Sequence, residues 1–327
     1  MFRFTRRLML AALCASTAMP LATHAQGYPD KPVRLVVGFA PGGPTDILAR
    51  IVATALGKAL GTSIIVENKA GGGGVIAAQG LTKAAPDGYT LMFAGDGQLT
   101  LLSQLTPSAG YDALRDFVPI RMAAGQSNVL IANKASGVTD VAALIAQAKA
   151  RPDGLSFGSA GNGTPSHLVG ALFENATGVK LLHVPYKGAG PAMTDLLGGQ
   201  IQLMFVGTPV AVRQAAQPQV QLLATTGQKR SARLPNLPTF AELGIQGLGD
   251  ETGVWWAVVA PAGVAPTIQA KLAQAMKTAL EDPTLRAAFV EQGVDLLDHD
   301  AATVRQWIAR DHARWAALIK ARKISTD

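Results

Sequence analysis

The sequence predicts an α/β fold in which two strand-helix series are followed by a helical tail. Short β-branched runs alternate with longer segments rich in alanine and leucine, a pattern typical of a parallel or mixed sheet covered by helices. The tail, residues 266–322, is almost wholly helical in pattern. Of the 327 residues, 48% are hydrophobic and only 16% are charged, which is too apolar for a disordered chain. At roughly 150 residues per domain, the length indicates about two domains, each able to bury a core.

The first series alternates strands and helices from residue 33 onward. Runs of β-branched and other apolar residues predict strands at 33–38, 63–67 and 90–94. A proline at the first helical position favours a helix from Pro44 or Thr45 to Leu60, and alanine-rich periodicity favours another at 75–84.

The second series repeats this alternation, and its helices end at glycines such as Gly178, Gly198 and Gly199. Its predicted strands are 128–132, 155–158, 179–184, 201–206 and 221–225, and its predicted helices are 141–150, 165–177 and 189–197. The helical tail is interrupted at Pro283 and Gly293. No Pro/Ser-rich linker separates the two series, so we expect the chain to cross between the halves as strands and the tail to pack back on the first half.

Residues 1–25 are predicted to be an export signal. Basic residues at Arg3, Arg6 and Arg7 precede the apolar run 8–13, and the segment ends in the small-x-small pattern 23–25. The paired arginines are ordinary charges of such a segment or mark the twin-arginine route. The mature chain is expected in the periplasm of a cell with two membranes. No later stretch reaches the roughly 18 apolar residues that span a bilayer, so a soluble mature protein is expected.

The basic charge of the whole chain is smaller in the mature protein. The formal net charge of +7 falls to +4 over 302 residues once residues 1–25 are removed. The remaining basic residues are dispersed, which argues against nucleic-acid binding. The only cysteine, Cys14, lies in the same segment, so the mature chain has no thiol for a disulfide, a metal or nucleophilic catalysis. A lipoprotein role for Cys14 is the less favoured alternative, because the bulky Leu13 precedes it.

Two glycine-rich loops, one in each half of the chain, lie between a predicted strand and a helix that begins with proline. Their free helix N-termini favour an anion, whereas ordinary βα turns capped by Thr and Ser are the alternative. The first loop offers Phe39, Ala40, Pro41, Gly42, Gly43, Thr45 and Asp46, and the second offers Ser159, Gly161, Asn162, Gly163, Thr164, Ser166 and His167. A pair of such loops facing each other could bind the two ends of a small dicarboxylate, or one carboxylate and one polar group.

Further candidate ligand contacts follow other strands, because ligands of open α/β sheets sit beyond the carboxyl ends of strands. These candidates are Gly95, Asp96, Gln98, Tyr186, Lys187, Gly188 and Thr208. Lys187 would add positive charge to an anion site or is simply solvated. Tyr186 would stack on a ligand or donate to it, or is half-buried in packing.

Several blocks in order give the chain a specific resemblance over nearly its whole mature length. They are 28–34, 41–46 with Arg50, 67–69, 84–91, 184–188, 195–201 and 237–239. In these blocks the chain resembles the Bug-type solute receptors of tripartite tricarboxylate transporters, which are two-lobed periplasmic binding proteins of the Venus-flytrap kind. The resemblance implies that a small organic acid is captured between the lobes, without a metal or cofactor, by a monomer that delivers it to membrane permease subunits. It implies one lobe from residues 26–125 plus 247–327 and a second from residues 126–246.

The chain departs from that family in the loop after the third strand. Such receptors commonly carry a small polar residue and a histidine where this chain has Asp96 and Gln98. Because an ionised Asp96 would repel a second anionic group, we expect a ligand with an amine or hydroxyl. The loop 205–209 has few polar groups, which favours an apolar or aromatic ligand body. Trp255 and Trp256 either line that region or, as we favour, pack in the core near the crossing between lobes.

We expect a receptor without catalytic activity, and two enzyme hypotheses are the alternatives. Residues 154–158 fit G-x-S-x-G, so Ser156 with His183 and Asp195 could form an exported serine hydrolase, although Ser156 falls inside a predicted strand. Residues 72–77 fit G-x-G-x-x-A with Asp96 about 20 residues on, a weak dinucleotide pattern. No pair of histidines has metal-ligand spacing, since His167 and His183 stand alone in the sequence.

Overall fold

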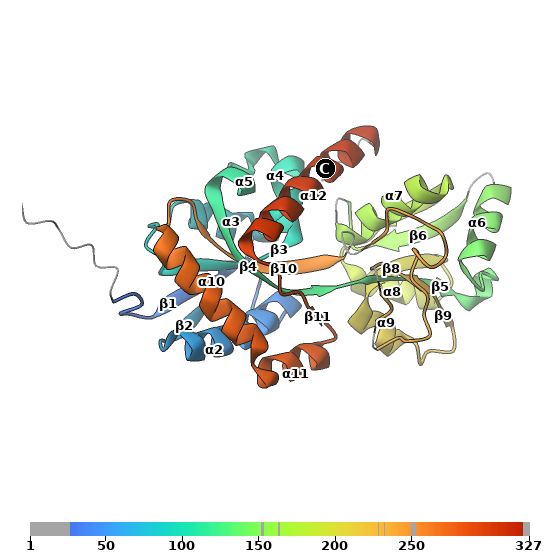
Figure 1. Cartoon of the computed structure of the whole chain (residues 1–327). Coiled ribbons are helices and arrows are strands. Elements are labelled where there is room, and N and C mark those ends of the chain that lie inside the picture. Colours follow the sequence, from blue (N-terminus) through green and yellow to red (C-terminus); the bar gives the residue numbers. More distant parts are fainter. Residues whose placement is uncertain are drawn as a thin grey trace, which may run out of the picture.

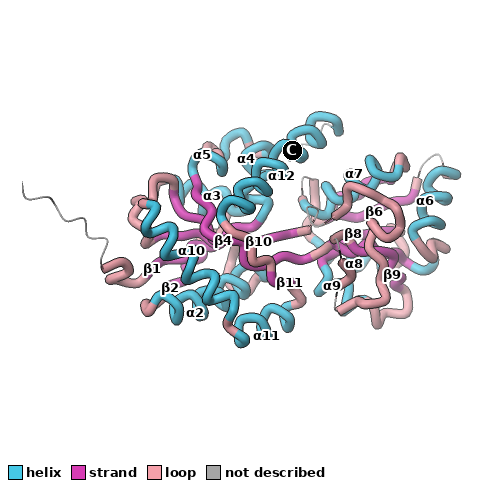
Figure 2. Tube along the Cα trace, in the orientation of Figure 1, coloured by secondary structure: helices cyan, strands magenta, loops and turns pink. Residues whose placement is uncertain are grey.

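The protein folds into two α/β lobes, each with a central β-sheet between helices (Figures 1 and 2). The structure is a computed structural model that describes residues 27–151, 154–162, 164–227, 229–231, 233–249 and 253–322. The predicted export signal at residues 1–25 lies outside the described residues. The two sheets confirm the predicted α/β class and its two-lobed form.

The sheet of the first lobe has the order β11-β4-β10-β3-β1-β2. Its strands are β1 (Val33–Val37), β2 (Ile64–Asn68), β3 (Thr90–Gly95), β4 (Phe117–Gln126), β10 (Val254–Pro261) and β11 (Asp295–Leu296). Strand β1 pairs in parallel with both β2 and β3, and β10 runs antiparallel between β3 and β4. The parallel strands come from the predicted βα alternation, and their carboxyl ends therefore lie along one edge.

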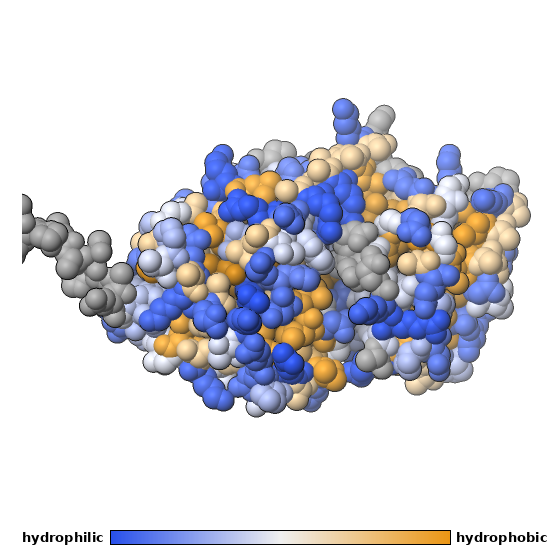
Figure 3. Space-filling view, viewed as in Figure 1, coloured by the Kyte–Doolittle hydropathy of each residue, from blue (hydrophilic) through white to orange (hydrophobic). Residues whose placement is uncertain are grey.

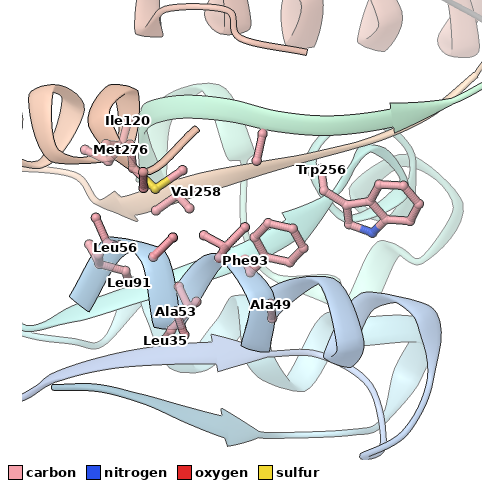
Figure 4. Close-up of a cluster of buried hydrophobic side chains, with 14 of the residues drawn as sticks. Leu35, Ala49, Ala53, Leu56, Leu91, Phe93, Ile120, Trp256, Val258 and Met276 are labelled. Atoms are coloured by element: carbon pink, nitrogen blue, oxygen red, sulfur yellow. The ribbon is translucent and has the colours of Figure 1, made fainter. Parts of the chain in front are cut away.

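Helices cover both faces of this sheet. They are α2 (Pro44–Leu60), α3 (Val75–Thr82), α4 (Leu102–Leu105), α5 (Ala113–Asp116), α10 (Pro266–Glu281), α11 (Pro283–Gln292) and α12 (Ala301–Arg322). Helices α2, α10 and α11 share one core with the sheet, and α3, α5 and α12 share the core on the other face. Figure 4 shows the first core, where Leu56 of α2 and Met276 of α10 pack toward Phe93 and Val258 of the strands. The tail thus packs back on the first lobe, as the sequence predicts.

The sheet of the second lobe has the order β7-β6-β8-β5-β9. Its strands are β5 (Asn128–Asn133), β6 (Leu155–Ser159), β7 (Leu181–Pro185), β8 (Leu203–Gly207) and β9 (Val220–Thr225). Its helices are α6 (Val141–Ala150), α7 (Pro165–Thr177), α8 (Ala189–Leu197) and α9 (Thr208–Gln214). Helices α6 and α7 pack on one face of the sheet, and α8 and α9 pack on the other.

The chain passes between the lobes as strands. Strand β4 of the first sheet ends at Gln126 and β5 of the second sheet begins at Asn128, while β9 ends in the second sheet before β10 returns to the first (Figure 1). Crossing by strands is as expected, but no range was predicted for β4, β10 or β11. Strand β4 contains Pro119, Arg121 and Gly125, which obscure the alternation that marks a strand. By contrast, α2, α6, α7 and α8 have the predicted bounds.

The C-terminal helix also contacts the second lobe. Trp315 and Leu318 of α12 pack with Leu168 and Ala171 of α7, and Leu101 and Leu105 of the first lobe join the same buried cluster. The C-terminal half of α12 therefore lies at the junction between the lobes (Figure 1).

Hydrophilic and apolar residues are mixed on the visible face of the molecule (Figure 3). On the face that Figure 3 shows, hydrophilic residues cover both lobes with apolar areas between them. Large exposed apolar side chains lie on separate elements, for example Ile65 on β2, Ile76 on α3 and Val290 on α11. Scattered single residues of this kind are normal for a folded surface. Within the described residues, no helix is both long enough and apolar enough to cross a lipid bilayer.

A substitution at Gly170 tests how tightly α7 packs on the sheet of the second lobe. A Cβ at Gly170 in α7 would lie 2.4 Å from the ring of Phe157, so Gly170→Ala should lower the free energy of unfolding by about 1–3 kcal/mol. Gly80→Ala in α3 is the matched control, because nothing lies within 4 Å of a Cβ at that position and alanine favours a helix. Urea unfolding measures both. Equal effects of the two variants would contradict this packing.

Candidate functional site

The candidate loops follow the carboxyl ends of parallel strands in both lobes. The loop after β1 leads into α2 in the first lobe, and the loop after β6 leads into α7 in the second. These edges are where α/β folds bind ligands. Gly163 of the second loop lies outside the described residues.

Helix α2 begins without a side-chain cap. Its N-cap residue is Gly43, no side chain hydrogen-bonds there, and Pro44 occupies the first helical position. The preceding Gly42 has a φ of +84°, a conformation that favours glycine. Phe39, Ala40 and Pro41 are exposed in the same loop. The alternative of an ordinary capped turn therefore does not apply to α2.

Asp46 organises the loop from inside the first turn of α2. Its buried carboxylate accepts the Gly42 N–H at 2.9 Å, Arg50 Nε at 3.0 Å and Asn68 Nδ2 at 2.8 Å. The hydrogen bond from Arg50 is the main reason why the pKa of Asp46 is lowered to about 2. Asp46 thus holds the loop in shape, with its negative charge balanced by Arg50.

Thr45 ties the same turn to the core of the first lobe. Its Oγ1 accepts the indole N–H of Trp256 at 3.1 Å. Trp255 and Trp256 are 1% and 4% exposed and lie in the cores on opposite faces of the sheet. Core packing near the crossing, the favoured interpretation of these tryptophans, is therefore confirmed.

Gln98 lies at the base of the loops of the first lobe. Its Oε1 accepts the Gly95 N–H at 2.8 Å, and its main-chain oxygen accepts the hydroxyl of Tyr111 at 2.6 Å. Its buried Nε2 has no hydrogen-bond partner in the described residues. A Cβ at Gly38 or Gly74 would lie 2.3 or 2.0 Å from this nitrogen. The side chain therefore fits only because both neighbouring loops carry glycine.

The residues after β3 form a helical turn instead of an open loop, and Asp96 lies at the start of this turn. A π-helical turn runs from Gly97 to Leu101, and Asp96 already has helical dihedral angles. The groups that act on its carboxyl are the Gly97 and Trp255 amides and the side chains of Asp311 and Arg314 on α12. Burial and, second, the charge of Asp311 raise its pKa to about 7. Charged groups of the C-terminal helix thus act on Asp96, and the expectation that it selects an amine or hydroxyl on a ligand stays a prediction.

Helix α7 also begins without a side-chain cap. Its N-cap residue Thr164 makes no capping hydrogen bond to the helix, and Pro165 follows. The Thr164 hydroxyl instead donates to the Gly161 oxygen at 2.7 Å, and Ser166 Oγ accepts the Ala160 N–H at 3.1 Å. Asn162 is exposed at the tip of the loop. The hydroxyl groups thus shape the loop before the helix and leave the helix terminus open.

A stacked pair of histidines supports this second loop, and the sequence did not reveal it. The rings of His167 and His183 are 3.8 Å apart and nearly parallel, and His183 also stacks on Phe157. His183 Nε2 lies 2.7 Å from the hydroxyl oxygen of Ser159. Burial is the main cause that lowers the pKa of both histidines, that of His183 to about 4. The two histidines that stand alone in the sequence are therefore neighbours in the fold.

The remaining candidates have other partners or are exposed. The hydroxyl of Tyr186 donates to Asp195 at 2.7 Å, and the hydroxyl of Thr208 donates to the Ser127 oxygen at 3.0 Å between the lobes. Gly188 donates its N–H to the Ala160 oxygen, which joins the two loops of the second lobe. Lys187 is exposed. The hydroxyl groups of Tyr186 and Thr208 are thus both hydrogen-bonded within the protein in this structure.

The residues of the serine-hydrolase hypothesis are not brought together. Ser156 donates to Gln202 Oε1 at 2.7 Å and lies on the face of β6 opposite to Phe157, on which His183 stacks. Asp195 pairs with Tyr186, so no Ser156–His183–Asp195 triad forms. Among the described residues, no three or more His, Cys, Asp or Glu side chains could hold a metal ion.

Two α/β lobes that are joined by crossing strands, each with an open helix N-terminus beyond a parallel strand, define a periplasmic-binding-protein fold. Residues 48–324 match the family model described as "Tripartite tricarboxylate transporter family receptor". The chain is 35% identical to Protein BugT of Bordetella pertussis over 318 residues, which are 97% of each chain. It therefore belongs to the TctC/Bug receptor family.

Solved structures of similar proteins share the whole fold. Rpa4515 of R. palustris with adipate is 33% identical, with a TM-score of 0.75 over 91% of this chain and 99% of that chain. MatC of Rhodopseudomonas palustris with bound malate is 29% identical, with a TM-score of 0.72 over 89% of this chain and 100% of that chain. The predicted family and two-lobed fold are thus confirmed.

Asp46 should stabilise the folded state in a pH-dependent way. Its folded pKa of about 2 lies below the ordinary value of 3.8, so its contribution is present above pH 4 and is lost as the pH falls toward 2. Asp46→Asn should therefore cost about 1–2 kcal/mol at pH 7 and progressively less at lower pH. Urea unfolding between pH 2.5 and 7 measures this difference. A cost that does not change with pH would contradict the role of the charge.

Asp96 should change the pH dependence of stability in the direction opposite to Asp46. Its folded pKa of about 7 lies above 3.8, so the folded state holds an extra proton between these values and loses stability as the pH rises through them. Asp96→Asn cannot ionise and should be more stable than the unmodified protein by roughly 2–4 kcal/mol at pH 8, with no difference at pH 4. Glu291→Gln on the exposed side of α11 is the control for the removal of a carboxylate. An unchanged profile for Asp96→Asn would show that Asp96 is ionised throughout.

Proposed function

We propose that the mature chain is a monomeric periplasmic receptor that binds a small organic carboxylate between its lobes and delivers it to the permease of a tripartite tricarboxylate transporter. The lobes are residues 26–125 plus 247–327 and residues 126–246. One observation carries the proposal: α2 and α7, which follow parallel strands in different lobes, both begin without a side-chain cap.

Uncapped helix N-termini suit a carboxylate for a simple physical reason. The first N–H groups of a helix have no intrahelical acceptor, and the helix dipole adds partial positive charge at that end. The proline that begins each helix lacks an N–H, so the glycine-rich loop before it supplies amides as well. Two such ends, one in each lobe, match the two ends of a dicarboxylate. Adipate and malate, with which Rpa4515 and MatC were solved, belong to this class.

Charge near the first loop is compatible with an anion. Asp46 lies in the first turn of α2, where an unpaired carboxylate would repel a ligand. Arg50 and Asn68 bind its oxygens, and Gly42 donates an N–H to it. The proposed site therefore attracts anions through backbone amides, with Asp46 already neutralised.

Closure of the lobes would bring the loops to one ligand. The chain passes from β4 of the first sheet to β5 of the second at Gln126–Asn128, so small dihedral changes there can rotate one lobe against the other. A ligand shifts the population toward the closed form only if it contacts both lobes. The proposed ligand therefore needs polar groups at both ends.

A thermal-shift screen tests this function. A ligand at 100 times its Kd adds about 2.7 kcal/mol of stability, so adipate, malate and related dicarboxylates should raise the Tm of the mature protein by several degrees. Adipamide is the matched control for adipate, because it has the same chain but no negative charge, and it should produce no shift. If several dozen carboxylates leave the Tm unchanged, or if adipamide matches adipate, the proposal is wrong.

A further inference from the structure

The loop between β6 and α7 is attached to one imidazole at both of its ends. Ser159, the last residue of β6, precedes the loop and contacts His183 Nε2 at 2.7 Å. His167, the third residue of α7, follows the loop and stacks on the same ring with centroids 3.8 Å apart. His183 itself lies on the neighbouring strand β7, directly opposite Phe157 in the register. The ring thus connects the strand, the loop and the helix.

Ser159 transmits this attachment to the loop backbone. Its side chain is fully buried, and its Oγ accepts the Gly161 N–H at 3.1 Å and lies 3.1 Å from the Gly161 oxygen. Gly161 has a φ of +131°, in the region that favours glycine, so its conformation depends on such contacts. A hydroxyl has one proton and can accept two hydrogen bonds, so an imidazole nitrogen completes the set of partners.

We propose that His183 is a positioning residue of the receptor: through Ser159 and His167 it holds residues 160–162 in the shape that presents their amides to a carboxylate. Preorganisation of this kind raises affinity, because a glycine-rich loop otherwise loses conformational entropy when a ligand binds. The proposal rests on the proposed function of the loop, but the shape of the unliganded loop tests it separately.

Two features indicate that the Ser159–His183 pair positions the loop and does not act as a catalytic pair. The pKa of His183 is lowered to about 4, mainly by burial and then by His167, so the two parallel rings stack without charge repulsion near neutral pH. Ser159 is fully buried and cannot reach a substrate as a nucleophile. The Ser159–His183 pair is therefore a support beneath the loop.

Three variants separate the hydrogen bond from the stacked rings. His183→Phe keeps a ring against Phe157 and His167 but removes the nitrogen, Ser159→Ala removes the hydroxyl, and His183→Gln keeps a polar atom that can reach Ser159. Ser156→Ala is the matched control, because Ser156 lies on the opposite face of the same strand and bonds only Gln202 in the described structure. Circular dichroism and Tm establish that each variant is folded.

The first measurement needs no bound molecule. Hydrogen exchange of the unliganded mature protein should show the Gly161 amide exchanging about three- to tenfold faster in His183→Phe and Ser159→Ala, which is the effect expected for one neutral hydrogen bond. His183→Gln should restore much of the protection, and Ser156→Ala should not change it. Equal exchange in all variants would overturn the proposal, even if one of them has a lower Tm.

The second measurement uses adipate and malate in calorimetric titrations. Whichever of them binds should bind about three- to tenfold more weakly to His183→Phe and Ser159→Ala, and the double variant should lose little more than either single one. Binding that is unchanged in these variants would overturn the role in affinity while leaving the proposed function intact. If neither acid binds any form of the protein, the exchange data alone decide the positioning role, and the function proposed for the site fails for these acids.

Discussion

Strand β10 is the constraint on which the rest of the structure depends. It lies between β3 and β4 in the first sheet, although it enters from the second lobe at the end of the long crossing. Its two adjacent tryptophans point to opposite faces, so Trp255 packs in the core with α12 and Trp256 in the core with α2. Their indole nitrogens reach Asp311 and Thr45, respectively. Strand β10 therefore connects the crossing between the lobes with the two hydrophobic cores of the first lobe and with the first turn of α2.

Electrostatics at the candidate site depends on local geometry more than on net charge. The formal charge of the chain is +7, yet the groups nearest the proposed anion site are amides, glycines and a neutralised aspartate. The buried carboxyl of Asp96 and the stacked histidines both favour their neutral forms, because burial penalises the charged form. A receptor built in this way attracts an anion without holding unpaired charges in its interior when it is empty.

Local sequence signals predicted most helices and strands of the fold. They did not reveal which side chains from distant parts of the chain meet near the candidate site. Proline at the first helical position and glycine after the last one locate α2 and α7, because both signals act within a single turn. Strands β4 and β10 pair with partners far away in the chain, and their burial on both faces removes the alternation on which a sequence prediction depends. The sequence likewise did not reveal that Asp311 and Arg314 of α12, more than two hundred residues later, act on the pKa of Asp96. The contact between His167 and His183 likewise exists only once β6, β7 and α7 are packed.

The position of α12 has a practical consequence for handling the protein. Its C-terminal half is buried against α7 and α4 at the junction between the lobes, whereas β1 begins on the far side of the first lobe (Figure 1). A peptide fused after α12 would be attached beside the junction between the lobes, where it would interfere with the proposed closure around a ligand. An affinity tag or surface anchor before β1 is remote from that junction (Figure 1). Immobilisation for binding studies is therefore best done through the N-terminal end.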